Sequence, residues 1–534
     1  MTRFETFLSL FTRIRPGEGR GILLLGVNGF LLVCAYYILK TLRESMILTE
    51  FDAETKAYAV AAIAVVLFFV VPLYGVLFRN TNRTQLVVVI NTFFLVNLVM
   101  FYLISQSGTS IAFQYYVWIG IFGVMTIAQF WAYATDIYNV RSGQRVFPVI
   151  MVAVAIGALA GAKFSAYAFP LLGTYGLMLV AGLLLTISLF FYRPARHAAP
   201  EDSRCIECEF VKPKFESLLG GFAVVLSDYY LRMIALFVVL LNWINSTGEY
   251  ILSEMVVRWA EGEIASGSAS SKEVLIAWFY GNFNFWVTLF GLVLQTFIVA
   301  RLLRYLGMPR SLMILPVLSA IGYALIAFIP IFTIVRLVKI VENGTDYSLM
   351  STIRQALLLP TSREVKYEGK TAIDTFFWRF GDLIQGGAIY VGINVYSFGV
   401  ADLALLNLVL ALIWIGVTVM IARQYCREVA TNMTSRPPEL HRPIPDVTLS
   451  PGQAFDMALH PETFVDPDPG DVITLRATLV NGDALPPWLA FRPKTGRFSG
   501  TPPRDSQPLQ VKVTARDFEN LTASASFTIR FSSS

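Results

Sequence analysis

Hydrophobic positions in this chain fall into long runs, and most polar positions cluster between them. Each run is close to the length of about 20 residues that a helix needs to cross a bilayer. The runs lie at residues 22–40, 57–78, 85–105, 112–134, 146–168, 171–192, 231–252, 275–300, 311–330, 332–352, 371–396 and 401–422. This pattern predicts an all-α polytopic membrane protein with about twelve transmembrane helices.

A polar break divides the runs into two sets of six. We expect an N-terminal half at 1–192, a central cytoplasmic loop at 193–230 and a C-terminal half at 231–428. A faint repeat accompanies this division, because a basic residue followed by small residues introduces the fifth helix of each half: Arg145, Gly157 and Gly161, then Lys370, Gly381 and Gly386. Repeated halves of this kind move against each other around a site near the bilayer midplane.

Composition agrees with a membrane protein and excludes an ordinary soluble one. The chain is 55% hydrophobic and 15% charged, and its mean hydropathy is +0.59. A net charge of +5, with basic residues at the ends of segments, gives no reason to expect nucleic-acid binding. The loops after even-numbered helices carry the Lys and Arg residues, which predicts that both ends of the membrane unit lie in the cytoplasm.

The composition changes after Arg427, where Pro, Asp, Gly and Thr become frequent. We expect a linker at 429–441 and a small β-sandwich module at 442–534, with strands near 472–479, 510–514 and 523–531. Residues 485–502 resemble Ig-like, cadherin-like modules, whose hallmark is W-L-x-F followed by T-G-x-F-x-G-T-P. That resemblance implies a core of Trp488, Leu489, Phe491 and Phe498, tight turns at Gly496 and Gly500, and a protein or glycan partner.

An Asp-rich turn in the module has two interpretations. Its carboxylates at Asp466, Asp468 and Asp471 suit a hard cation such as calcium. Alternatively the turn holds no ion, which we favour because free calcium is scarce in the cytoplasm, where the topology places the module. Cys205 and Cys208 form a C-x-x-C without a second pair nearby, so neither a zinc site nor a redox pair is expected.

The stretch 331–370 carries the most informative polar residues. At 100° per residue, five of them fall within roughly a 120° wedge of one helix: Arg336, Lys339, Glu342, Asn343 and Asp346. A charge in the bilayer core costs about 2.5 kcal/mol or more, so such groups normally face a hydrated pathway. The alternative is that the cations snorkel at a helix end and the acids neutralise them. Arg354 follows further along.

Three other helices carry polar stripes, and the fourth helix ends in a single acid. The first helix has Lys40, Arg43 and Glu44, and the seventh has Asn242, Asn245 and Glu249; the eleventh has Asp374, Arg379 and Asp382 beyond Lys370, and the fourth ends at Asp136. Helix ends at the interface are the alternative for the first, and a cytoplasmic cap is the alternative for Asp136. The surplus of cations and amides suits an anionic substrate. With three His and no phosphate-binding loop or zinc motif, neither an enzyme nor a cofactor is expected.

Five stretches resemble the ATP/ADP translocase family, the bacterial and plastid nucleotide exchangers. They are I-L-K-T-L-R-E-S-M-I-L at 38–48, L-N-W-I-N-S-T-G-E-Y-I-L at 241–252, E-N-G-T-D-Y-S at 342–348, R-Q-A-L-L-L-P-T-S-R-E at 354–364 and K-T-A-I-D at 370–374. The resemblance covers residues 20–425 and implies a major-facilitator-like bundle in a bacterial inner membrane that exchanges nucleotides by alternating access.

Within that resemblance, Lys40 and Arg43 match the arginine and the lysine of the family motif I-L-R-D-T-K-D, and Glu249 corresponds to an essential acid. Two departures concern the substrate. Residues 116–121 lack the glutamate that plastid members carry in the fourth helix, and Phe380-Gly381-Asp382 replaces part of a basic L-G-K-S-G motif.

The leading hypothesis is therefore an ATP/ADP antiporter in contact with the lipid bilayer. Its predicted substrate-binding residues are Lys40, Arg43, Asn242, Asn245, Glu249, Arg336, Lys339, Asp346 and Arg354, and its predicted gating or charge-pairing residues are Glu44, Asp136, Glu342, Lys370 and Asp374. A transporter of the same fold for another phosphorylated or organic anion is the first alternative. A membrane scaffold or sensor that presents the Ig-like module is the second.

Overall fold

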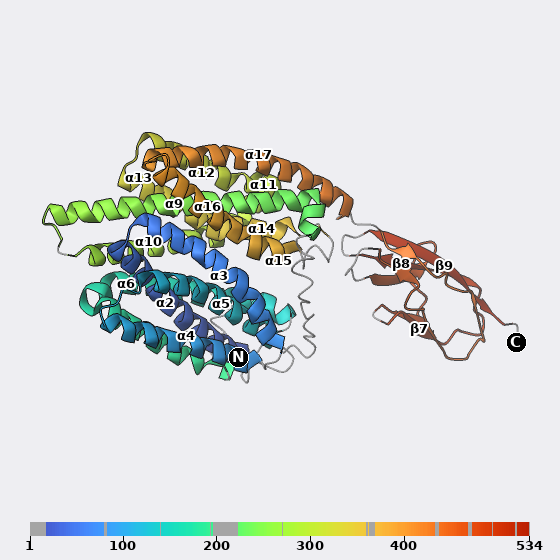
Figure 1. Cartoon of the computed structure of the whole chain (residues 1–534). Coiled ribbons are helices and arrows are strands. Elements are labelled where there is room, and N and C mark those ends of the chain that lie inside the picture. The colour runs from blue at the N-terminus through green and yellow to red at the C-terminus, as the bar shows by residue number, and fades with distance from the viewer. Residues whose placement is uncertain are drawn as a thin grey trace. The chain divides into compact units, whose positions relative to one another are not determined.

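The computed structural model divides the chain into two compact units, Met1–Arg427 and Glu428–Ser534. It describes residues 18–79, 83–138, 140–192, 194–195, 223–269, 271–358, 361, 369–432, 437–467, 473–493, 495–517 and 521–532. Figure 1 shows that the first unit is built from helices and the second from strands. The predicted thiol pair in the central loop lies outside the described residues.

The described residues of the N-terminal half of the membrane unit form long helices. They are α2 Glu18–Glu50, α3 Ala53–Arg79, α4 Arg83–Gln106, α5 Ala112–Ile137 and α6 Val140–Leu189. The fifth and sixth predicted helices both lie in α6, which breaks at Gly173, where φ is +63°. A left-handed residue at this position costs Gly little, so the chain can begin a second helix here.

The C-terminal half is more segmented. It contains α9 Tyr229–Ala265, α10 Lys272–Val293, η2 Leu294–Val299, α11 Ala300–Leu312, α12 Ile314–Phe328, α13 Phe332–Thr345, η3 Asp346–Met350, α14 Ser351–Leu357, α15 Lys370–Ala372, η5 Ile373–Phe377, α16 Trp378–Asn394 and α17 Val400–Asn432. Asp228 caps α9 by accepting a hydrogen bond from the Leu231 amide at 2.9 Å. Each predicted apolar run thus coincides with helix, and eight described stretches are long and apolar enough to cross a membrane.

The segmentation has a specific form. The elements η2, η3 and η5 are π-helical turns, which insert an extra residue into a helix and often mark functional sites. The predicted helix 332–352 is therefore α13, η3 and α14 in succession. This insertion begins at Asp346, so the simple 100° wheel places the earlier residues of α13 correctly but not those that follow.

Small residues let the first helix and the fifth helix of a half approach closely. A Cβ atom on Gly157 would contact the carbonyl oxygen of Phe30, and one on Gly161 would contact that of Cys34, both in α2. In the other half, a Cβ on Gly381 of α16 would lie 2.8 Å from the carbonyl oxygen of Val239 in α9. Such small residues at contacts between membrane helices are a common packing device.

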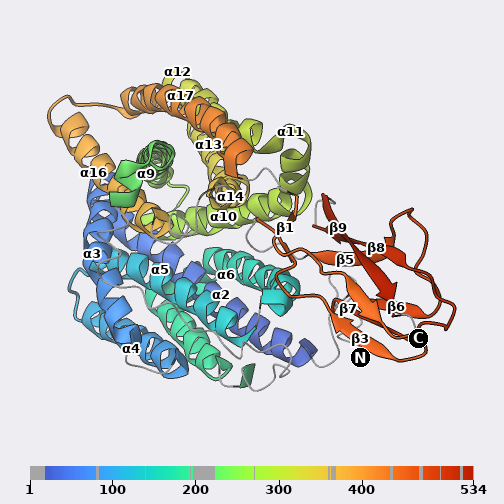
Figure 2. The same cartoon turned by 90° about the vertical axis from the view of Figure 1, so that its right-hand side faces the viewer.

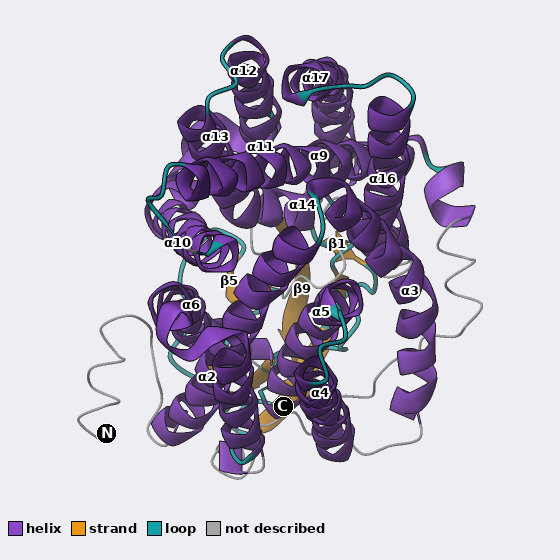
Figure 3. Ribbon diagram, turned by 60° about the vertical axis from the view of Figure 1, so that its left-hand side comes forward, coloured by secondary structure: helices purple, strands orange, loops and turns teal. Residues whose placement is uncertain are grey.

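The two halves meet along two flanks. Figures 2 and 3 show α10 beside α6 on one flank and α16 beside α3 on the other, and both pairs are in contact. The hydrophobic core of the C-terminal half also continues into Ile47, Leu48, Ala53, Ala57, Ile63 and Tyr116 of the N-terminal half. These residues lie near the end of α2 and the starts of α3 and α5, which we call the α2–α3 end of the bundle.

The second unit contains two main sheets, as expected for a small β-sandwich. One sheet has the order β2-β9-β8-β5 and the other β3-β7-β6, while β1 pairs with β4. The strands are β1 Glu439–Leu440, β2 Val447–Leu449, β3 Phe455–Ala458, β4 Phe464–Val465, β5 Thr474–Leu479, β6 Leu489–Arg492, β7 Arg497–Gly500, β8 Leu509–Arg516 and β9 Thr522–Phe531.

The core of this unit contains the residues that the module motif predicts. Leu489 and Phe498 are buried, and Trp488 and Phe491 pack against them. Gly496 has a φ of +61°, and a Cβ on Gly500 would contact the carbonyl oxygen of Trp488, so both positions require glycine. The expected linker 429–441 is structured at both ends, because α17 continues to Asn432 and β1 begins at Glu439.

Candidate functional site

The polar face of α13 forms one closed network with α9. Lys339 is fully buried at 0% exposure, although it is a lysine inside the membrane unit. Its Nζ atom donates to Glu342 Oε2 at 2.8 Å and to Asn245 Oδ1 at 2.8 Å, and Glu249 Oε1 lies 3.7 Å away. Asn343 donates to the same Glu249 oxygen at 2.7 Å. A buried charge needs several partners of this kind to replace its water.

Helix α12 completes this network from the opposite side. Tyr323 donates its hydroxyl to Glu342 Oε2 at 2.8 Å, and Ser319 donates to Glu342 Oε1 at 3.1 Å. Gly248 of α9 provides the space, because a Cβ there would contact the Tyr323 hydroxyl and would lie 2.9 Å from Lys339 Nζ. All members belong to the C-terminal half, and we call them the α13 network: Asn245, Gly248, Glu249, Ser319, Tyr323, Lys339, Glu342 and Asn343.

The polar face of α2 forms a second network with different connections. Arg43 pairs with Glu44 at 3.1 Å, and Lys56 in the first turn of α3 pairs with the other carboxylate oxygen at 2.7 Å. The Arg43 guanidinium lies over the ring of Tyr116 in α5, 4.5 Å from its centroid. Glu44 and Lys56 are both buried, with 4% of each residue exposed.

This second network crosses between the halves. Lys56 Nζ donates to Ser253 Oγ in α9 at 2.6 Å and to the Tyr280 hydroxyl in α10 at 3.3 Å. The two hydroxyls are 3.0 Å apart. We call this set the α2 network: Arg43, Glu44, Lys56, Tyr116, Ser253 and Tyr280.

Three cations of the predicted site lie beside aromatic rings. Lys40 lies 5.4 Å from the ring centroid of Tyr37, Arg336 lies 5.8 Å from that of Phe279, and Arg354 lies 4.1 Å from that of Trp378. Among the described residues, no carboxylate oxygen is within 4.0 Å of these three cations, and the buried Nε atom of Arg354 has no hydrogen-bond partner.

The remaining predicted residues divide into buried and peripheral ones. Asn242 donates to the Trp378 carbonyl at 2.7 Å, beside the pair of Arg379 and Asp382. Asp346 is buried, but its Oδ1 atom has no hydrogen bond and no described cation lies within ion-pair distance. Among the described residues Asp346 has no ion pair within 4.0 Å, and the expectation that it pairs with the site's cations stays a prediction.

The other predicted site residues lie outside the two networks. Lys370 donates to Gln355, and Asp374 is exposed. The side chain of Asp136, and all of Asp468 and Asp471, lie outside the described residues. Within the part of the chain that is described, no group of three or more His, Cys, Asp and Glu side chains has the arrangement of a metal site.

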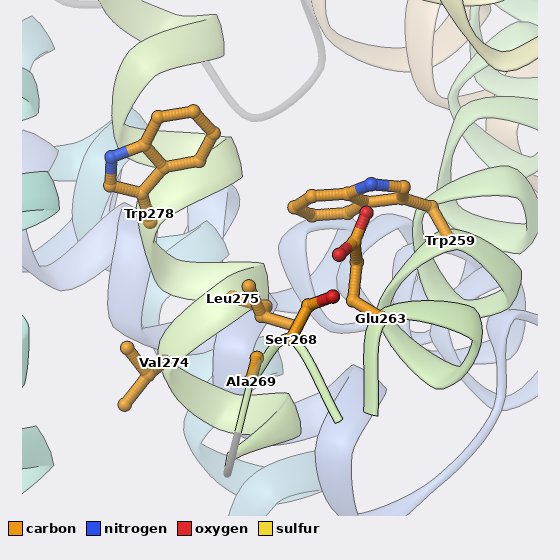
Figure 4. A pocket seen from close by; sticks show the side chains of 7 residues that line it. All are labelled: Trp259, Glu263, Ser268, Ala269, Val274, Leu275 and Trp278. Carbon is orange, nitrogen blue, oxygen red and sulfur yellow. The ribbon is translucent and has the colours of Figure 1, made fainter. Parts of the chain in front are cut away.

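A cavity of about 410 Å³ lies where α9 ends and α10 begins (Figure 4). It is lined by Trp259, Glu263, Ser268, Ala269, Val274, Leu275 and Trp278. Trp259 also stacks on Phe332, with the ring centroids 5.5 Å apart. None of the predicted site residues lines this cavity, which is therefore separate from the two networks.

Sequence reasoning missed Lys56, Tyr116, Ser253, Tyr280, Ser319 and Tyr323. The apolar run of the second helix begins at residue 57, so Lys56 resembled a loop residue at the membrane edge. The hydroxyl residues carry no charge and interrupt no pattern. The sequence carried no signal for Lys56, because the excess of cations over acids on α2 predicts a further acid rather than a further cation.

Comparison with known proteins gives different results for the two units. A family model described as "Putative Ig domain" matches residues 437–532. The chain is 23% identical to ADP,ATP carrier protein 1 of Chlamydia pneumoniae over 331 residues, which are 54% of this chain and 60% of that protein. The counterpart from Chlamydia trachomatis is 22% identical and covers 50% of this chain and 56% of its own length.

The membrane unit is similar to ADP,ATP carrier proteins. The chain spans about 60% or less of the length of these curated relatives.

Solved structures agree on the fold. The nucleoside transporter NupG superimposes with a TM-score of 0.53 at 18% identity, covering 76% of this chain and 98% of that one. A bacterial homologue of the iron transporter ferroportin gives 0.54 at 15% identity, with 76% and 98% covered. The predicted major-facilitator-like fold of an integral membrane protein is thereby confirmed.

Proposed function

We propose that the membrane unit is a transporter that exchanges nucleotides, ATP against ADP, by alternating access. The observation that carries this proposal is a set of three membrane-unit cations, Lys40, Arg336 and Arg354, that have no carboxylate oxygen of the described residues within 4.0 Å and lie beside aromatic rings. A charge in the bilayer core is costly unless it is paired or hydrated, so such groups mark a route for a counter-charge. The similarity to ADP,ATP carriers supports phosphates as that counter-charge.

The predicted substrate-binding residues differ in whether their polar groups already have partners in the α2 network or the α13 network. In this proposal Lys40, Arg336 and Arg354 contact the phosphates at successive points of the route, since Arg336 and Arg354 are roughly 27 Å apart along one helical run. Among the described residues, the donors of these three cations are not paired with acids within 4.0 Å. Arg43 is 13% exposed in its side chain and exchanges Glu44 for phosphate. Glu249, whose side chain is 29% exposed, borders the site and is held in place by Lys339 and Asn343. Asn242 and Asn245 orient the same wall.

Aromatic rings at the cations fit a ligand with both phosphates and a base. Tyr37, Phe279 and Trp378 each present a ring to one of the three cations. Rings at these positions offer a stacking surface for a nucleobase beside the charges that bind its phosphates. In the orientation expected from the Lys and Arg bias, the packed α2–α3 end faces away from the cytoplasm.

Exchange in liposomes tests the proposal. Purified protein is reconstituted with internal ADP, and uptake of labelled ATP is measured for the wild type, Lys40→Met, Arg354→Met and the control Lys272→Met. Each lost hydrogen bond to a phosphate removes about 1.5–3 kcal/mol of binding free energy. The ATP concentration that gives half-maximal uptake should therefore rise roughly 10-fold to 100-fold in the first two variants. Lys272 pairs with Glu261 at an exposed site of the bundle and should behave as wild type.

Binding is measured separately from transport by the stabilisation that a ligand gives to the folded protein. ATP and ADP should raise the unfolding temperature of the wild type and of Lys272→Met, and much less that of Lys40→Met. Wild-type liposomes that take up no ATP against ADP would refute the proposal. A panel of phosphorylated metabolites in competition would show whether another anion displaces ATP and is the true substrate.

A further inference from the structure

Lys56 is the residue through which the charged face of α2 reaches the other half of the bundle. Its ammonium group is within 2.7 Å of Glu44 in its own half and within 2.6 Å of Ser253 in the other. Tyr280 of α10 is a third neighbour at 3.3 Å, and the ring of Tyr280 lies 5.0 Å from the ammonium. One side chain thus connects α2 and α3 with α9 and α10.

The surroundings of Lys56 make this connection hard to replace with water. Only 4% of Lys56 is exposed, and the contact lies inside the apolar packing that joins the halves at the α2–α3 end. Ser45 donates to the Glu273 carbonyl of α10 at 2.8 Å at the same end, and Asn394 of α16 donates to Glu54 of α3. Opening this end must therefore break the Lys56 bonds to Ser253 and Tyr280.

Glu44 links this contact to the substrate site. Its carboxylate is shared between Arg43 and Lys56, which lie 3.1 Å and 2.7 Å from its two oxygens. When a phosphate binds Arg43, Glu44 loses one of its two cations and holds Lys56 alone. A stronger attraction toward Glu44 draws the ammonium toward α2 and away from Ser253 and Tyr280.

We propose that Lys56 is a positioning residue that keeps the α2–α3 end closed while the site is empty and releases it when an anionic substrate occupies Arg43. This inference rests on the proposed nucleotide exchange and explains why transport is an exchange. An empty carrier cannot reorient because Lys56 remains bound across the halves, whereas a loaded carrier can. The consequence is that loss of the Lys56 contact converts exchange into net leakage.

The main experiment measures efflux of labelled ADP from loaded liposomes with and without external ATP. In the wild type, efflux without external ATP should be slow. Lys56→Met removes the charge at similar volume, and it should raise this unpaired efflux at least about tenfold, which is the effect of losing one hydrogen bond to a charged group. Lys56→Arg keeps a donor and a charge and should restore slow efflux. Lys272→Met, which lies at an ion pair within one half, should resemble the wild type.

A second variant tests the inference independently of whether Lys56→Met folds. Ser253→Ala combined with Tyr280→Phe removes both acceptors in the other half but leaves the pair of Lys56 and Glu44 intact. It should raise unpaired efflux in the same direction, with nucleotide-dependent stabilisation retained. If both variants keep unpaired efflux at the wild-type rate, or if Lys272→Met raises it equally, the inference is wrong.

Opening of the α2–α3 end is also measured without transport. Ser45 is fully buried at this end, so a cysteine placed there by Ser45→Cys, in protein whose four native cysteines are replaced, reacts with a maleimide only when the end opens. Lys56→Met should accelerate this reaction at least about tenfold. This measurement separates the two proposals: absence of ATP–ADP exchange in the wild type refutes the nucleotide function, while an unchanged labelling rate in Lys56→Met refutes the role of Lys56.

Discussion

The α2 network and the α13 network contain similar residues, yet they are connected differently. In the α13 network, every described partner of Lys339 and Glu342 comes from α9, α12 or α13, within one half of the bundle. In the α2 network, Lys56 bonds to both halves. The first can move as a rigid unit when the halves rock, whereas the second must change. The difference indicates that α13 holds its wall of the site in shape and that α2 couples the site to movement.

Loss of Lys339 should give the largest effect on stability. Lys339 is the one described cation within ion-pair distance of Glu342, so Lys339→Met leaves that carboxylate buried and unpaired, at a cost of about 3–5 kcal/mol. Lys56→Met should cost much less, because Glu44 retains Arg43. Thermal unfolding in detergent compares the two variants. The double variant Lys339→Met with Glu342→Gln should recover part of the loss, and equal losses for Lys339→Met and Lys56→Met would contradict the comparison.

A methyl group at Gly248 should give an intermediate effect. Gly248→Ala places a Cβ against the Tyr323 hydroxyl and Lys339 Nζ, and overpacking of this kind costs about 1–3 kcal/mol. Gly262 lies in the same helix with nothing within 4 Å of its Cβ position, so Gly262→Ala is a matched control. That control should be neutral or stabilise by up to about 1 kcal/mol, because Ala favours a helix more than Gly. Equal unfolding temperatures for the two variants would contradict the tight packing of the α13 network around Gly248.

Removal of the β unit should have the smallest effect on either network. The chain divides into separate compact units at Arg427, so deletion of residues 437–534 should leave the unfolding temperature of the membrane unit and its exchange rate unchanged. Gly500→Ala in the intact chain is the complementary test. Its Cβ would contact the Trp488 carbonyl, so this variant should unfold the β unit alone. Loss of exchange on deletion would instead show that transport requires the module.

The fold was largely predictable because its determinants are local. Apolar runs of spanning length coincide with helices, and the motif from Trp488 to Pro502 coincides with the turns and core of the β unit. The π-helical turns at η2, η3 and η5 were not predictable, because they depend on packing against neighbouring helices rather than on a composition signal.

The candidate site shows the same division. Periodicity alone placed Lys339, Glu342 and Asn343 on one polar face, and these side chains do share one network. Which cation pairs with which acid depended on residues from other helices, such as Tyr323 and Asn245. The sequence by itself determined that charged groups are enclosed in a membrane unit, because hydropathy and spacing are properties of single segments. Only the tertiary structure decided that Glu44 pairs with Lys56 and that Lys40 and Arg354 have no ion pair within 4.0 Å among the described residues. Those relations arise where α2, α3, α9 and α16 meet in space.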